Sequence, residues 1–136
     1  MKVTGGCYCG AVRYRAEGEV VAKAMCTCRQ CQHIAGGGPS MIMGMPETGF
    51  TYTQGEPRAF ARSDLAEPAV REFCPDCGTH LLTRTPRSPG VVLIKVGSLD
   101  DLAVFGMPQV AVHTGEKQPY HLIPEGVRCF ATVPGK

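Results

Sequence analysis

The sequence predicts a mainly β fold with at most one or two short helices, held together by bound metal. Three observations support this expectation. The 136 residues include 17 glycines and 11 prolines, which leave little room for long helices. Apolar and polar side chains alternate along many short segments, as they do in half-buried strands. Eight cysteines lie mostly in tight groups, a spacing typical of metal ligands.

The strand candidates are short and bounded by turns. Met41, Met43 and Met45 form a stripe at strand spacing that we expect to be one face of the core. Strands are expected over residues 12–17, 20–24, 40–45, 50–53, 58–62, 70–73, 81–85, 91–96 and 127–133. The one helix candidate is 29–35, because three glycines and Pro39 follow it. Residues 98–101 are expected to be a turn capped by Ser98 or Asp100.

Length and charge narrow the class of protein. A chain of this size suits a single domain over 1–136, because it can bury one modest core. A formal net charge of +2 without a basic run argues against nucleic-acid binding. The N-terminus lacks a signal-peptide apolar region, and the longest apolar run, 91–94, is too short to cross a bilayer. We therefore expect a cytoplasmic protein with no membrane partner, in a compartment where disulfides are rare.

Seven of the eight cysteines form three groups. The groups are Cys7-x-Cys9, Cys26-x-Cys28-x2-Cys31 and Cys74-x2-Cys77. Cys129 stands alone and is expected to pack as a small core residue.

The first and last groups together supply four thiolates, the number that closes a structural zinc site. Cys74 and Cys77 have the spacing of half a zinc ribbon, at the tip of an expected hairpin. Joining them to Cys7 and Cys9 would connect the start of the chain to its middle. The alternative is that these four thiols are buried small residues or form occasional disulfides.

The middle group is one ligand short of a closed site. Cys26, Cys28 and Cys31 leave a position that a protein side chain, water or an exogenous ligand could fill; the protein candidates are His33, His80 and His113. An open position is typical of a catalytic zinc, and a three-thiolate zinc suits a further soft ligand. A small-molecule thiol is therefore the expected substrate. Zinc would deprotonate it, and its sulfur could attack an aldehyde carbon.

The motifs, in order, resemble those of the glutathione-dependent formaldehyde-activating enzyme family, which also includes centromere protein V. The resemblance covers about residues 3 to 125. It rests on GGCYCGAVRY (5–14), the middle cysteine group, GEP (55–57), FCPDCGT (73–79) and VGSLDD (96–101).

The resemblance implies a zinc-bearing stack of antiparallel sheets, sometimes called a β-tent, and the condensation of formaldehyde with glutathione to S-(hydroxymethyl)glutathione. It implies a structural zinc at the first and last cysteine groups and a catalytic zinc at Cys26, Cys28 and Cys31. The expected function is thus a carbon-sulfur lyase-type enzyme of formaldehyde detoxification with two zinc ions and with glutathione and an aldehyde as partners.

Several polar residues remain open between a functional and a structural role. Arg29, Gln30 and Gln32 could contact a carboxylate or peptide group of glutathione, or could form a solvated helix face. His113 and His121 could donate protons in the pocket, although lone surface histidines are commoner.

Two other classes of function also fit the cysteines. One is a non-catalytic zinc-binding scaffolding module, in which both metals are structural. The other is a redox sensor, whose middle thiolates oxidise and release zinc.

Overall fold

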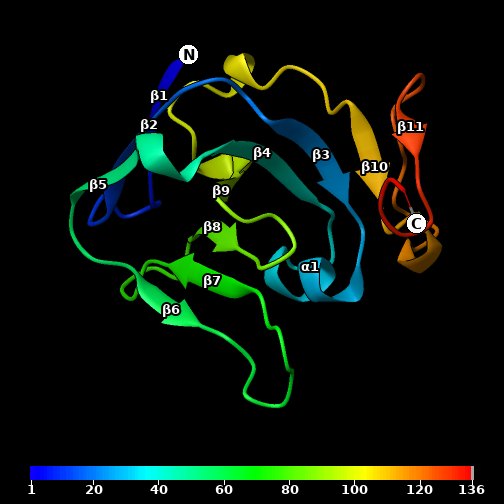
Figure 1. Ribbon diagram of the computed structural model, residues 1–136, viewed down its shortest axis with the longest axis horizontal. Helices are drawn as coiled ribbons and strands as arrows, with labels where there is room; N and C mark the ends of the chain where they lie inside the picture. The colour runs from blue at the N-terminus through cyan, green and yellow to red at the C-terminus, as the bar shows by residue number, and fades with distance from the viewer. Residues whose placement is uncertain (136) are drawn as a thin grey trace.

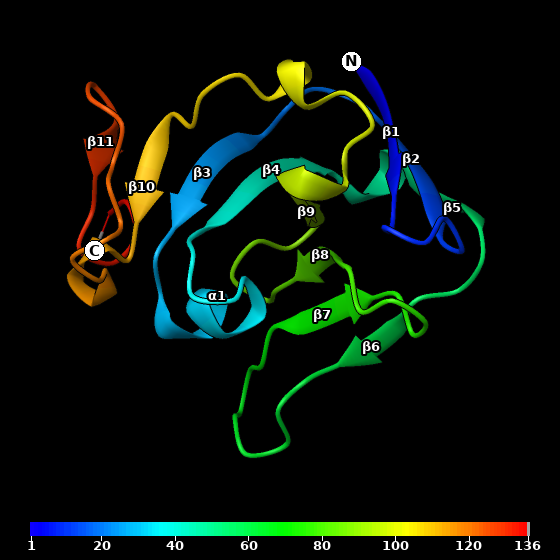
Figure 2. The ribbon, with the colours of Figure 1, turned by 180° about the vertical axis from the view of Figure 1, so that it is seen from behind.

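The computed structural model describes residues 1–135 and consists of two β-sheets that meet at an angle, with one α-helix against the larger sheet (Figures 1 and 2). The smaller sheet has the strand order β1-β2-β5, and all its neighbours are antiparallel. Its strands are β1 (Lys2–Gly6), β2 (Arg13–Glu17) and β5 (Phe50–Gln54).

The larger sheet has the strand order β11-β10-β3-β4-β9-β8-β7-β6. Its strands are β3 (Ala22–Cys26), β4 (Ser40–Pro46), β6 (Arg58–Phe60), β7 (Val70–Phe73), β8 (His80–Arg84), β9 (Val91–Lys95), β10 (Val110–Val112) and β11 (Arg128–Cys129). Six of these strands form an antiparallel series from β3 to β6, whereas β10 is parallel to both β3 and β11. The expected mainly β fold with antiparallel sheets is confirmed, with a parallel addition at one edge.

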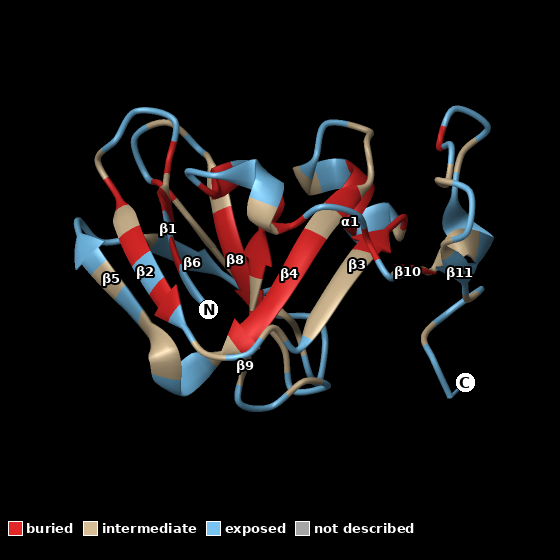
Figure 3. Ribbon diagram, turned by 90° about the horizontal axis from the view of Figure 1, so that it is seen from above, coloured by how far each residue is buried: buried red, intermediate tan, exposed pale blue. Residues whose placement is uncertain are grey.

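The main core lies between the two sheets (Figure 3). Tyr14 of β2 is buried there against Met43 and Met45 of β4 and Ile94 of β9. The methionine stripe therefore forms part of the core, as expected, and its flexible thioethers fill the wedge between sheets that are not parallel.

One helix, α1 (Arg29–Ile34), follows β3. It ends where Gly36 and Gly37 take positive φ angles of 68° and 98°, so the expected stop is confirmed. Short 3-10 turns occupy Glu47–Gly49, Val96–Ser98, Leu102–Val104 and Thr114–Glu116. None of the helices among residues 1–135 has both the length and the apolar character needed to cross a bilayer.

The expectations for individual elements differ from the structure at several places, among them β10, which is absent from the expected strands. β1 was not expected, because Lys2–Gly6 contains a single large apolar residue, Val3, and gains its strand geometry from pairing with β2. The last strand covers two residues instead of 127–133. The 3-10 turn directly after β9, Val96–Ser98, has no side-chain cap, and the next one, Leu102–Val104, is capped by Asp101, whose side chain accepts from the Ala103 amide; neither Ser98 nor Asp100 is a cap.

Candidate metal centres and adjoining cavities

The cysteines gather into two groups whose sulfur atoms all lie within 4.8 Å of one another. One group holds Cys7, Cys9, Cys74 and Cys77, and the other holds Cys26, Cys28 and Cys31. All eight cysteines are free thiols. The structure therefore brings together the same sets of four and three that ligand counting suggests.

The four-cysteine group joins the loop after β1 to the β7–β8 hairpin. Cys9 Sγ lies 3.6 Å from Cys7 Sγ and 3.8 Å from Cys74 Sγ. Four sulfurs at about 2.3 Å from a tetrahedral zinc are separated by about 3.8 Å, so the donor set fits the ion. Gly78, with φ of +78°, allows the chain to turn directly after Cys77.

Hydrogen-bond donors surround these sulfurs. The Val12 amide donates to Cys7 Sγ at 3.2 Å, and the Asp76 amide donates to Cys74 Sγ at 3.4 Å. The hydroxyl of Thr79 lies 3.2 Å from Cys77 Sγ, and its hydrogen bond lowers the pKa of Cys77 to about 5. Donors of this kind stabilise thiolates, which are the form that binds zinc.

The three-cysteine group lies on the opposite face of the larger sheet from the main core, where β3 leads into α1. Cys26 ends β3, and Cys31 is buried within α1. Cys28 is the N-cap of α1, and its sulfur accepts from the Cys31 amide at 3.3 Å. Hydrogen bonds from Cys26 and Cys31 lower the pKa of Cys28, and the same contact with Cys28 raises the pKa of Cys26. Within the group, these contacts therefore favour the thiolate form at Cys28 over that at Cys26.

A buried lysine accompanies this cluster. Lys95, at the end of β9, donates from Nζ to Ser40 Oγ at 2.9 Å, and Ser40 is the β4 partner of Cys26. Burial lowers the pKa of Lys95, while the negative charge of the nearby cysteines raises it. The sequence patterns do not predict a role for Lys95 or Ser40, although a lysine that ends the apolar run VVLIK is a signal of an unusual buried charge.

A cavity of about 580 Å³ reaches the four-cysteine group at Cys7 and comes near the three-cysteine group at Ser40, the β4 partner of Cys26, although none of those three cysteines lines it. Lys95 and Ser40 line it on the side of the three-cysteine group, and Cys7 and Thr79 line it on the other side. Its volume is within the range of small-molecule sites. Asp100 also reaches this cavity, so both signs of charge are present.

Within the described residues, none of the four histidines belongs to either cysteine group. His33 is exposed on α1, and His80 stacks on Phe73 with ring centroids 5.4 Å apart. His113 has a positive φ of 55°. The pKa of Cys28 is lowered mainly by hydrogen bonds from Cys26 and Cys31, and His113 makes a smaller contribution in the same direction. The surface position expected for most lone histidines is wrong for His121, which is buried. Its Nδ1 accepts a hydrogen bond from the Gln118 amide at 2.8 Å, and its Nε2 lies 2.7 Å from the Gly37 carbonyl oxygen.

The structure also places the polar residues of α1 and Cys129 in specific environments. Gln32 is buried, and its amide donates to the Thr27 and Glu116 carbonyls, at 2.8 and 2.9 Å, so it forms no part of a solvated helix face. Gln30 contacts Arg71, and Arg29 donates to Gln32. Cys129 is exposed, which contradicts the expected core position, because β11 lies at the outer edge of the larger sheet.

Comparisons with known proteins found similar sequences and a similar fold. The family model described as glutathione-dependent formaldehyde-activating enzyme matches residues 2–116. A protein of Halomonas elongata named "Putative glutathione-dependent formaldehyde-activating enzyme" is 28% identical over 141 residues, which cover 98% of this chain and 90% of that protein. A crystal structure of a Rhodobacter sphaeroides protein has the same fold, with a TM-score of 0.61 at 18% identity, covering 76% of this chain and 94% of that chain.

The family match spans both cysteine groups and every strand except β11. The chain belongs to the glutathione-dependent formaldehyde-activating enzyme family.

Proposed function

We propose that this protein is a zinc-dependent carbon-sulfur lyase-type enzyme that interconverts glutathione plus formaldehyde and S-(hydroxymethyl)glutathione. The observation that carries the proposal is the incomplete ligand set. Three sulfurs of Cys26, Cys28 and Cys31 gather with no histidine or carboxylate among residues 1–135 to complete them, beside a full set of four. A metal site with three protein ligands retains a position for substrate, and family membership supplies the two reactants.

The two groups would have different roles. The four-cysteine group holds a structural zinc, because its ligand set is complete. Zinc at the three-cysteine group would supply a Lewis acid that lowers the pKa of a thiol substrate. The amide hydrogen bond to Cys28 holds that sulfur in place at the start of α1.

The cavity beside Lys95 would hold glutathione. Glutathione carries two carboxylates and one ammonium; this cavity offers the ammonium of Lys95 and, at its far side, the Arg13–Asp100 ion pair, whose two charges already satisfy each other. Holding the thiol and the aldehyde together lowers the entropic cost of their encounter.

Lys95 would act on the aldehyde oxygen. When the glutathione sulfur, having lost its thiol proton, bonds to the formaldehyde carbon, the carbonyl π electrons move to oxygen, which takes up one proton in place of the one the thiol released. Lys95 is buried and faces the cavity, so its ammonium can donate a hydrogen bond to that developing charge. In the reverse direction the same group would hold the hydroxyl as the carbon-sulfur bond breaks.

The test compares Cys28→Ser with the wild type after reconstitution with zinc. Serine retains the helix cap and removes a thiolate, so we expect a folded protein with about one zinc per chain instead of about two. Formation of S-(hydroxymethyl)glutathione, followed by exchange NMR, should be accelerated by the wild type and not by this variant.

The matched control is Cys129→Ser, because Cys129 is exposed and outside both groups. It should retain both zinc ions and full activity. Unchanged zinc content and unchanged rate in Cys28→Ser would contradict the proposal. A cobalt-substituted protein whose spectrum ignores glutathione would instead favour a scaffolding module.

A further inference from the structure

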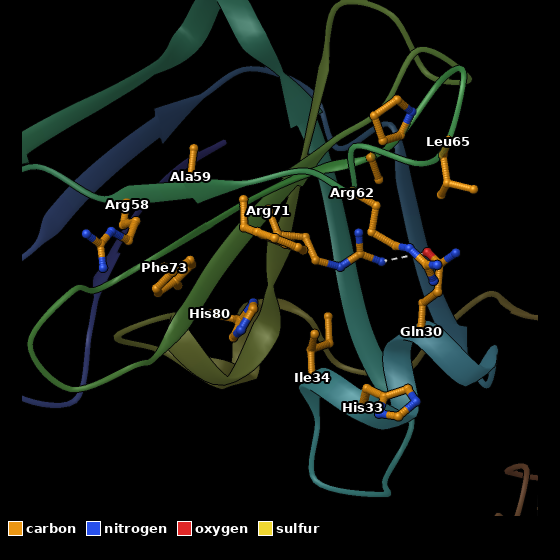
Figure 4. A pocket seen from close by; sticks show the side chains of 13 residues that line it. Gln30, His33, Ile34, Arg58, Ala59, Arg62, Leu65, Arg71, Phe73 and His80 are labelled. Carbon is orange, nitrogen blue, oxygen red and sulfur yellow. Dashed lines mark hydrogen bonds between the residues drawn. The ribbon is translucent and has the colours of Figure 1, made fainter.

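A second cavity, of about 720 Å³, lies between α1 and the strands β6 and β7 (Figure 4). It is enclosed by α1, by β6, β7 and the start of β8, and by the loop between β6 and β7. Ile34 and His80 line both cavities, so the two sites are neighbours. Formaldehyde has two heavy atoms and does not need a space of this size.

The wall of this cavity is mainly apolar. Phe73 and Ile34 are partly buried in it, and Phe60 and Leu65 remain 58% and 42% exposed at its edge. Large apolar side chains left exposed around a concave surface are typical of a binding site. They would contact the body of an apolar ligand.

The charge of the lining is positive only. Arg58, Arg62 and Arg71 line the cavity, and no aspartate or glutamate does. Arg62 is paired with Asp64, but neither Arg58 nor Arg71 has an ion-pair partner within the described part of the chain. Two guanidinium groups beside apolar walls favour an anionic ligand, because arginine binds carboxylates with two parallel hydrogen bonds.

Arg71 is already oriented for such a ligand. Its guanidinium donates to Gln30 Oε1 at 3.0 Å, and Figure 4 shows this side chain extending from β7 towards α1. Beside it, His80 Nδ1 is buried without a hydrogen-bond partner. A ligand oxygen or N–H group could satisfy that atom, whose isolation is otherwise unfavourable.

Glutathione fits this cavity poorly. Its α-ammonium would meet two arginines without an ion-pair partner, two histidines and no carboxylate. We infer that the cavity is a second ligand site that binds a small organic anion with an apolar body, such as an aromatic carboxylate held by Arg71 and Arg58. This cavity adjoins the proposed glutathione site at Ile34 and His80, and the inference does not depend on the proposed reaction.

The test is calorimetric titration of the zinc-loaded protein with 2-naphthoate and with the neutral 2-naphthamide. We expect the acid to bind at least about tenfold more tightly, since a charged hydrogen bond is worth at least that factor. Arg71→Met should weaken binding of the acid by about tenfold or more and leave the amide unaffected. Arg58→Met provides a second variant, because Arg58 is exposed and its loss cannot disturb the core.

Arg87→Met is the matched control, since Arg87 is exposed on the loop before β9 and outside the cavity. Equal affinities for acid and amide, or equal losses in the Arg71 and Arg87 variants, would overturn the inference. Displacement of 2-naphthoate by glutathione would also overturn it, because the cavity would then belong to the thiol substrate. Binding that persists in Cys28→Ser would separate this site from the proposed reaction.

Discussion

At the scale of single residues, one ion pair holds the turn after β9 against the smaller sheet. Arg13 Nη1 on β2 donates to Asp100 Oδ1 at 2.9 Å, and the Thr4 hydroxyl donates to Asp100 Oδ2 at 2.7 Å. These donors lower the pKa of Asp100 to about 2, with Arg13 the larger cause. Because the Asp100 side chain is 44% exposed, solvent weakens the interaction considerably.

Asp100→Asn should lower the free energy of unfolding by about 0.5–1 kcal/mol at pH 7. The folded pKa lies below the unfolded value of about 3.9, so the stabilisation is complete above that value and is lost as the pH falls towards 2. Urea unfolding of the zinc-loaded protein between pH 8 and pH 5 should show a constant difference from the wild type.

Glu125→Gln is the control, because Glu125 is exposed and has no ion pair within residues 1–135. Its unfolding should match that of the wild type. A difference for Asp100→Asn that shrinks between pH 8 and pH 5 would disagree with this account, since Asp100 is ionised over that whole range.

At the scale of elements, the close approach of β1 to the turn after β9 depends on a glycine. A Cβ atom on Gly5 would lie 2.3 Å from the Tyr14 hydroxyl oxygen and 2.4 Å from the Ser98 carbonyl oxygen. That space is occupied by the hydrogen bond between Tyr14 Oη and Ser98 Oγ, 2.7 Å long and buried. The backbone around Gly5 therefore cannot accept a side chain without separating the two segments.

Gly5→Ala should destabilise the zinc-loaded protein by about 1–3 kcal/mol, the usual cost of overpacking. The comparison is Gly97→Ala, because nothing lies within 4 Å of a Cβ there and its φ is not positive. Thermal unfolding should show a clear decrease for the first variant and little change for the second. Equal melting temperatures would show that β1 moves freely enough to absorb a methyl group.

At the scale of the whole molecule, the four-cysteine group cross-links two sheets. Cys7 and Cys9 follow β1 of the smaller sheet, and Cys74 and Cys77 lie in the β7–β8 hairpin of the larger sheet. Zinc binding by such ligands is worth about 10–16 kcal/mol, comparable to the total stability of a domain, about 5–15 kcal/mol. The fold therefore depends on this group if it holds zinc.

Cys74→Ala should remove the structural zinc and lower the melting temperature by tens of degrees or prevent folding, because Cys74 is fully buried among its partners. Metal content and thermal unfolding measure both effects. The exposed Cys129, changed to Ala, should leave both unchanged. An unaltered melting temperature for Cys74→Ala would contradict a structural role.

Much of the fold could be predicted because it depends on local patterns. The alternation around Met43 and the glycines after Ile34 specify a strand and a helix end without reference to the rest of the chain. β1 and the buried position of His121 could not be predicted, because each depends on a partner distant in the sequence. The predicted core position of Cys129 failed for a related reason. A short apolar run becomes a buried strand only where another element covers it, and both residues of β11 are exposed.

The cysteine spacing and the four-ligand rule for structural zinc are sufficient to divide the thiols into four, three and one: spacing forms the small groups, and ligand counting joins the first and last of them. Lys95, Arg71 and the two cavities follow only from the tertiary structure. Their neighbours come from strands and a helix far apart along the chain, and no local pattern records which faces will meet. The arrangement of charge around the open cysteine group is thus a property of the packed sheets.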